Sequence, residues 1–238
     1  MRLLTRLVLG RRLHVEGVAN VPRTGPVMVV GNHVATVDPP LVGSRITRTD
    51  IFAMAKTEAF RTRFARFFLL GWNAFPVVRH TADRAALSFA LRCLAEGHAL
   101  LMFPEGTRSE DTALHRAYPG VGFIALRSGA PVVCAAISGS ENVLPKGRTL
   151  PRRAAVELRF GERFVVPRRH ADGRRVTNQE AADLIMTRLA SLLPEVYRGI
   201  YPAVAPGVSP VPAERGQPSD GHTESGSADP TTPAVPAA

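Results

Sequence analysis

The chain has 238 residues, 45% of them hydrophobic and 21% charged, with a formal net charge of +10. This composition agrees with a globular protein, the length suffices for one domain with a sizeable core, and no run approaches the ~20 apolar residues of a spanning helix. The basic balance indicates an acidic partner, namely an anionic lipid surface, an acidic carrier protein or nucleic acid.

The amino-terminal segment, residues 1–14, is short, basic and leucine-rich, and we expect it to be amphipathic and to lie on a membrane surface. It has no apolar stretch followed by a small-residue cleavage site, so no signal peptide is expected. The two cysteines, Cys93 and Cys134, lack C-x-x-C spacing, which favours a reducing compartment over a structural disulfide. We therefore expect a peripheral protein at the cytoplasmic face of the cell membrane.

An apolar run at residues 27–30 predicts a short buried strand, which Gly31 ends. Shortly after it, His33 stands five positions before Asp38, in the sequence G-N-H-V-A-T-V-D. An imidazole exchanges protons near neutral pH, and a carboxylate on its second ring nitrogen would fix the tautomer. Five residues is not a same-face helical spacing, so the two side chains must meet across a turn. In the alternative, Asp38 only caps a helix at 39–46 that begins with two prolines.

Strands are expected at 51–55 and 75–78, with a helix at 57–70 between them. That helix places four phenylalanines on one face and three arginines off it: Phe60, Phe64, Phe67 and Phe68, and Arg61, Arg63 and Arg66. A basic amphipathic helix of this kind can lie in a membrane interface. The alternatives are that the phenylalanines face the core or line a tunnel for an acyl chain.

A helix at 83–97 and a strand at 99–103 lead to a second motif, F-P-E-G-T-R-S. Ligands bind at the carboxyl ends of strands in open α/β sheets. Arg108 suits a phosphate because its planar guanidinium makes two parallel hydrogen bonds, and Glu105 would orient it or bind a hydroxyl. The alternative is a surface turn with an ordinary ion pair.

The remaining pattern predicts a helix at 121–128, strands at 132–137 and 155–160, and a helix at 178–197 that opens with a capping box at Thr177 and Glu180. Alternating strands and helices predict an α/β fold, with a mostly parallel central sheet flanked by helices in a single domain over residues 15–202. Residues 203–238 contain seven prolines and four glycines, and we expect a disordered tail.

Together, the two motifs resemble those of the glycerolipid acyltransferase family (the 1-acylglycerol-3-phosphate, or lysophospholipid, acyltransferases), whose signature pair is N-H-x-x-x-x-D and F-P-E-G-T-R-S. The resemblance covers roughly residues 15–165. It implies transfer of a fatty acyl group from an acyl-CoA or acyl-carrier-protein thioester to the free hydroxyl of a lysophospholipid, first of all 1-acylglycerol-3-phosphate, giving phosphatidate.

The resemblance also implies roles for individual residues. His33 is the general base and Asp38 orients it, with no covalent intermediate and no cofactor or metal. The substrate would be bound by Asn32, Arg79, Glu105, Gly106, Thr107 and Arg108. The implied partners are a membrane surface with anionic lipids, the thioester donor and the lysophospholipid, with no specific nucleic acid.

Two weaker blocks of the family have counterparts here. Residues 71–79, ending in Arg79, resemble a block that helps to hold the acceptor phosphate. Residues 129–137 resemble an apolar strand, but Cys134 stands where the family usually has a second proline. The family often carries a lysine two residues before a glycine, and that lysine is missing here, because Tyr118 precedes Pro119 and Gly120. These departures leave another lysolipid, or glycerol 3-phosphate, open as the acceptor.

Other classes of protein fit the sequence less well. A serine hydrolase would need G-x-S-x-G, which does not occur. Residues 120–125 match the loose dinucleotide fingerprint G-x-G-x-x-A, but they do not follow a convincing strand. The seven histidines lack metal-ligand spacing. The basic charge would allow a nucleic-acid-binding module, but the sequence has no helix-turn-helix signal, and salt-dependent retention of random DNA should be weak and nonspecific for an acyltransferase. An inactive lipid-binding relative would not need both motifs intact.

Overall fold

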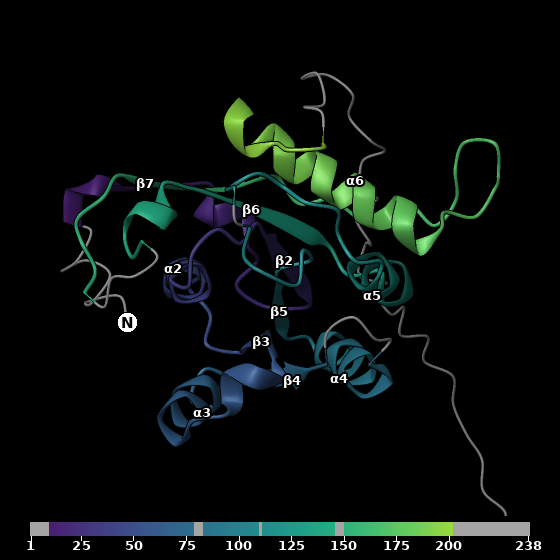
Figure 1. The fold of residues 1–238 in the computed structure, drawn as a ribbon. Helices are drawn as coiled ribbons and strands as arrows, with labels where there is room; N and C mark the ends of the chain where they lie inside the picture. The colour runs from purple at the N-terminus through teal and green to yellow at the C-terminus, as the bar shows by residue number, and fades with distance from the viewer. Residues whose placement is uncertain (1–9, 79–82, 110, 146–149, 202–238) are drawn as a thin grey trace, which may run out of the picture.

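The computed structural model describes residues 10–78, 83–109, 111–145 and 150–201. Arg79, most of the predicted amino-terminal segment and the predicted tail lie outside these residues. Within them, seven strands form one sheet in the order β1-β7-β6-β2-β5-β3-β4 (Figure 1). All neighbouring strands are parallel except the antiparallel pair β6–β7, which confirms the predicted α/β fold with a mostly parallel sheet.

The strands are β1 (Leu13–Glu16), β2 (Val27–Gly31), β3 (Ile51–Lys56), β4 (Ala74–Val77), β5 (Ala99–Met102), β6 (Val132–Ser138) and β7 (Val156–Phe160). The α-helices are α2 (Asp38–Arg45), α3 (Arg63–Leu70), α4 (Arg84–Ala95), α5 (Gly120–Ser128) and α6 (Asn178–Ser191). Short 3-10 helices are η1 (Gly10–Arg12), η2 (Val18–Asn20), η3 (Thr57–Phe60), η4 (Ser140–Asn142) and η5 (Glu195–Tyr197). In the described ranges, no helix is both long enough and apolar enough to cross a membrane.

Helices cover both faces of the sheet (Figure 1). Strand β2 is buried along its whole length, and its side chains alternate between two clusters. Met28 and Val30 pack in the cluster that includes residues of α4, α5 and α6, whereas Val27 and Val29 pack in the cluster that includes residues of α2. This two-sided burial explains why the sequence of β2 is a continuous apolar run.

The central strands end together at one edge of the sheet. In the parallel register, Val30 of β2 lies opposite Met102 of β5, and Gly31 lies opposite Ala135 of β6. The loops that follow β2 and β5 carry the two sequence motifs. Parallel pairing therefore places both motifs side by side, next to the chain that follows β6.

Three expectations about secondary structure were wrong in detail. The helix expected at 57–70 is divided into η3 and α3, and Thr62 directly precedes α3, where threonine is a favoured capping residue. The helix expected at 178–197 ends at Ser191, because Pro194 cannot continue a helix. Strand β1 was not expected, and it takes Leu13 and His14 from the predicted amino-terminal segment. The capping box at Thr177 and Glu180 is confirmed.

Gly122 allows α5 and α6 to approach closely. A Cβ atom at Gly122 would lie 1.9 Å from the carbonyl oxygen of Asn178 and 2.8 Å from the backbone nitrogen of Ala182. Gly122→Ala should therefore push the helices apart and lower the free energy of unfolding by about 3 kcal/mol, the upper end of the usual overpacking range. The control is Gly120→Ala in the same helix, where the Cβ atom would meet only the side chain of Leu87 at 3.8 Å.

Urea unfolding followed by circular dichroism measures both variants. An unfolding midpoint of Gly122→Ala equal to that of Gly120→Ala would show that α5 and α6 are not packed backbone against backbone.

Candidate active site

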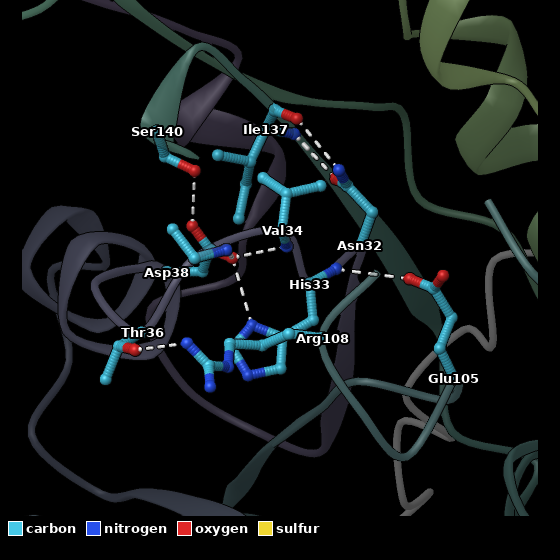
Figure 2. Close-up of polar contacts among 10 residues, drawn as sticks. Asn32, His33, Val34, Thr36, Asp38, Glu105, Arg108, Ile137 and Ser140 are labelled. Atoms are coloured by element: carbon cyan, nitrogen blue, oxygen red, sulfur yellow. Dashed lines mark hydrogen bonds and ion pairs between the residues drawn. The ribbon is translucent and has the colours of Figure 1, made fainter. Parts of the chain in front are cut away.

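His33 and Asp38 meet across the turn between β2 and α2, as the spacing predicts. The Nδ1 atom of His33 lies 3.0 Å from Oδ2 of Asp38 (Figure 2). The Asp38 side chain is fully buried, whereas 19% of the His33 side chain is exposed. With Nδ1 hydrogen-bonded to the carboxylate, the proton-accepting nitrogen Nε2 is on the opposite side of the ring.

The Asp38 carboxylate is held by four hydrogen bonds. Besides the histidine, Oδ2 accepts the backbone N–H groups of Val34 at 2.8 Å and Ala35 at 2.7 Å. Oδ1 accepts the hydroxyl of Ser140 at 2.6 Å. Asp38 is the first residue of α2, the helix is capped at Val37 and the cap makes no side-chain hydrogen bond. The alternative in which Asp38 only caps the helix is therefore wrong, because its oxygens bind the preceding turn and the histidine.

Asn32 fixes the chain just before the histidine. Its side chain is 1% exposed and pairs with the backbone of Ile137 in β6, donating to the carbonyl and accepting from the N–H group, both at 2.8 Å (Figure 2). These bonds continue the β2–β6 ladder beyond the end of β2. In the structure Asn32 thus has a positioning role, and its predicted contact with substrate stays a prediction.

Glu105 lies under the histidine loop rather than on the surface. Its side chain accepts the backbone N–H of His33 at 3.2 Å and that of His115 at 3.0 Å, and the residue is 4% exposed. Burial raises the pKa of Glu105 above its usual range, and the two backbone donors oppose this rise only in part. The carboxylate therefore links the loop after β2 to the loop after β5.

The raised pKa of Glu105 predicts a pH-dependent stability. The folded state holds the Glu105 proton more tightly than the unfolded state, so stability is lost as pH rises from about 4.5 through the raised pKa. Glu105→Gln cannot titrate. We expect the wild type to lose free energy of unfolding relative to Glu105→Gln as pH rises through this interval.

Urea unfolding at several pH values between about 4 and 7 measures the free energy of unfolding of both proteins. The control is Glu162→Gln, because Glu162 is exposed. A wild type that gains stability relative to Glu105→Gln over this interval would contradict the assignment.

Thr107 and Arg108, in the second motif, are exposed. The Nη1 atom of Arg108 donates to the hydroxyl of Thr36 at 2.9 Å, which joins the second motif to the first (Figure 2). The guanidinium is thus exposed to solvent beside the first motif, where a phosphate could reach it. Glu105 bonds the backbone of the loops, as described above, and Arg79 lies outside the described residues.

Gly106 has a φ of 68°, and a Cβ atom there would come within 2.9 Å of the Tyr118 ring. Tyr118, which stands where the family often has a lysine, therefore packs over the turn at Gly106 in the second motif. Cys134, the other departure, lies in the core. It is 2% exposed, its Sγ atom is 3.6 Å from the carbonyl oxygen of Ile185 in α6, and burial raises its pKa to about 12. Neither cysteine of the chain is in a disulfide.

Two residues of the site were missed in the sequence. Phe103 packs on His33 with ring centroids 4.7 Å apart, and a Cβ atom at Gly31 would lie 3.0 Å from that phenylalanine ring. Ser140 reaches Asp38 from the turn after β6. The phenylalanine belongs to the second motif and could have been considered. A lone serine 102 positions from Asp38 gives no signal in one sequence.

The structure also bears on the rival motif and on metals. Gly120 and Gly122, which match the dinucleotide fingerprint, open helix α5, and Gly122 is used for packing against α6. In the described ranges, no group of three or more His, Cys, Asp or Glu side chains is arranged to hold a metal ion.

Known proteins are similar to this chain in sequence and in structure. Residues 12–138 match the family model described as Acyltransferase. The 1-acyl-sn-glycerol-3-phosphate acyltransferase of Bacillus subtilis is 33% identical over 144 residues, which is 60% of this chain and 69% of that protein. A protein of the same name from Borreliella burgdorferi is 27% identical over 139 residues, 58% of this chain and 55% of that protein.

Among solved structures, the 1-acyl-sn-glycerophosphate (LPA) acyltransferase PlsC from Thermotoga maritima matches with a TM-score of 0.55 and 29% identity. The match covers 64% of this chain and 61% of that one. The matches thus span 55–69% of the length of these three proteins. The match to the family model covers more than half of this chain and includes the histidine–aspartate pair and the second motif. The chain therefore belongs to the Acyltransferase family.

Proposed function

We propose that this protein is an O-acyltransferase that moves a fatty acyl group from an acyl-CoA or acyl-carrier-protein thioester to the free hydroxyl of 1-acylglycerol-3-phosphate. The observation that carries the proposal is the His33–Asp38 pair, held at the carboxyl edge of the sheet next to an exposed arginine. The relatives named as 1-acyl-sn-glycerol-3-phosphate acyltransferases support this choice of acceptor.

In the proposed mechanism, Nε2 of His33 takes the proton from the acceptor hydroxyl while that oxygen attacks the carbonyl carbon of the thioester. Asp38 holds the Nδ1 proton and stabilises the imidazolium that forms. The carbon–sulfur bond then breaks, and the departing thiolate takes the proton from His33. The products are the new ester and the free thiol, so no covalent acyl-enzyme and no cofactor is required.

The surrounding residues have distinct proposed roles. Arg108, joined by Arg79, holds the acceptor phosphate, and Gly106 and Thr107 shape the loop on which the phosphate rests. Asn32, Glu105 and Ser140 keep the histidine and aspartate in place through the bonds described above. Phe103 limits the rotation of the imidazole ring by packing on it.

We also propose that the enzyme acts as a peripheral protein at the cytoplasmic face of the cell membrane. The two free cysteines favour a reducing compartment, and the proposed acceptor and product are lipids. The basic charge of the chain supports contact with anionic lipids or with an acidic carrier protein.

The proposal is tested by measuring thiol release from long-chain acyl-CoA, and from an acyl carrier protein, with a panel of acceptors. We expect release to depend on 1-acylglycerol-3-phosphate. Release that depends on glycerol 3-phosphate or on another lysolipid would change the acceptor and retain the reaction class. Release that ignores every acceptor would refute the transferase.

A further inference from the structure

Helix α3 presents an unusual surface for the edge of a folded domain. Phe67 is 78% exposed and Leu70 is 53% exposed, although both are large apolar residues. The two are three positions apart and therefore share one face of the helix. The sequence alone left open whether the phenylalanines of this segment face the core. Phe67 does not face the core, because most of its side chain is exposed. The side chains of Phe64 and Phe68 are not among those that the structure describes.

Positively charged residues of α3 border these two apolar side chains. Arg63 is four residues before Phe67, and Arg66 is four residues before Leu70, so each arginine lies one turn away from an exposed apolar side chain. Both arginines are exposed. We call these four residues the α3 strip. Bulky apolar side chains next to guanidinium groups can bind a membrane interface, where acyl chains lie just below anionic headgroups.

The position of the α3 strip relates it to the candidate active site. Helix η3, which leads into α3, follows directly after β3, and β3 is separated from β2 only by β5. The carboxyl ends of β2 and β3 are therefore roughly 10 Å apart, at two strand spacings. Just after α3, Trp72 lies against α2, since a Cβ atom at Gly43 would be 3.5 Å from its ring. Helix α2 begins at Asp38, and Figure 1 shows α3 as the outlying helix on this side of the molecule.

From these observations we infer that the α3 strip is the surface on which the protein docks to an anionic phospholipid bilayer, with Phe67 and Leu70 in the acyl boundary and Arg63 and Arg66 at the lipid phosphates. This inference rests on the proposed function in one respect. A lipid acceptor must reach His33 from the bilayer, and docking through α3 sets the bilayer beside α2 and the site.

The chain provides its own reporter for this contact. Trp72 is the only tryptophan and stands two residues after Leu70. Vesicles of phosphatidylcholine with phosphatidylglycerol, made with brominated acyl chains, should therefore quench the fluorescence of Trp72 when the wild-type protein binds. Binding should be weaker on phosphatidylcholine alone and should fall with added salt.

Two variants separate the apolar and the charged contributions. Phe67→Ser should lower the vesicle partition coefficient roughly tenfold on either lipid composition, because it removes a large inserted side chain. The double variant Arg63→Gln with Arg66→Gln should lower it on the order of tenfold on the phosphatidylglycerol vesicles only. The matched control is Val196→Ser, which removes an apolar side chain of similar exposure, 75%, in η5. All these positions are exposed, so the melting temperatures should be unchanged.

Several results would overturn the inference. The first is that the protein binds vesicles without quenching of Trp72 fluorescence. The second is that Phe67→Ser binds vesicles with the same partition coefficient as the wild type. The third is that Phe67→Ser and Val196→Ser lower the partition coefficient equally. A lipid-free dimer that Phe67→Ser dissociates, with vesicle binding unaltered, would assign the strip to a second copy of the chain instead. Vesicle binding involves no thioester and no turnover. A protein that binds through α3 but transfers no acyl group would therefore refute the proposed function and leave the docking surface standing.

Discussion

His33→Ala is expected to lower kcat for acceptor-dependent thiol release on the order of 10²–10⁴-fold, the usual contribution of a positioned general base. The fold should survive, because the hydrogen bonds that hold this loop run through the backbone of His33. Its N–H group donates to Glu105 and its carbonyl oxygen accepts from the N–H group of Ser109 at 2.8 Å. Steady-state rates with saturating acyl-CoA and 1-acylglycerol-3-phosphate measure the effect.

The control is His14→Ala. His14 lies on the edge strand β1 and pairs with Glu16 at the surface. Strands β7 and β6 separate it from β2, so its removal should leave the rate near that of the wild type. A His33→Ala enzyme that keeps a rate within a few-fold of the wild type would exclude His33 as the base.

Asp38→Asn is expected to have the second-largest effect, a loss in kcat on the order of 10²–10⁴-fold with little change in KM. The amide oxygen can still accept from Val34, Ala35 and the ring of His33, as Oδ2 does now. The negative charge that stabilises the imidazolium is lost, however. We expect a decrease of about 1–3 kcal/mol in the free energy of unfolding, because a buried carboxylate with four donors is replaced by a neutral group.

Ser140→Ala tests a smaller change at the same carboxylate, on the oxygen Oδ1. It removes one donor from Oδ1 and keeps the charge, so kcat should fall less than in Asp38→Asn. Rates and urea midpoints are measured for both variants. If Asp38→Asn proved as active as the wild type, the carboxylate would be only a structural anchor for the turn and not part of the catalytic pair.

Much of the site could be predicted from the sequence because its main signals are local. A short apolar run followed by Gly31 marks the end of β2, and the spacing from His33 to Asp38 requires a turn between them. The same holds for β5 and the loop that contains Glu105 and Arg108. In a parallel sheet, two loops that follow neighbouring strands must lie at the same edge, which is why the motifs meet.

Other parts of the site depend on contacts between distant residues. Ser140 approaches Asp38 only because β6 pairs with β2 and the chain turns at Gly139, which has a φ of 81°. Glu105 was expected to act on Arg108 or on substrate, but its carboxylate faces two backbone N–H groups that only the folded loops bring together. Such backbone partners carry no residue-type signal and therefore cannot be read from sequence.

The fold was also less predictable where the apolar pattern is short or ambiguous. Strand β1 has only four residues with alternating half-buried and exposed side chains, so its pattern is weak. The pattern of α6 continued to Val196, yet Pro194 ends the helical run and Val196 is 75% exposed. For α3, the stripe of phenylalanines could not reveal whether it faces the core or the solvent, because both give the same helical period.

The most direct test of the central claim is a rapid-quench experiment with isotopically labelled long-chain acyl-CoA. The enzyme is mixed with the donor alone and then with 1-acylglycerol-3-phosphate, and both protein and lipids are analysed by mass spectrometry. Direct attack by an acceptor activated by His33 predicts an unmodified protein before the acceptor is added and labelled phosphatidate afterwards. A labelled acyl group on the protein, or labelled free fatty acid in place of phosphatidate, would contradict it.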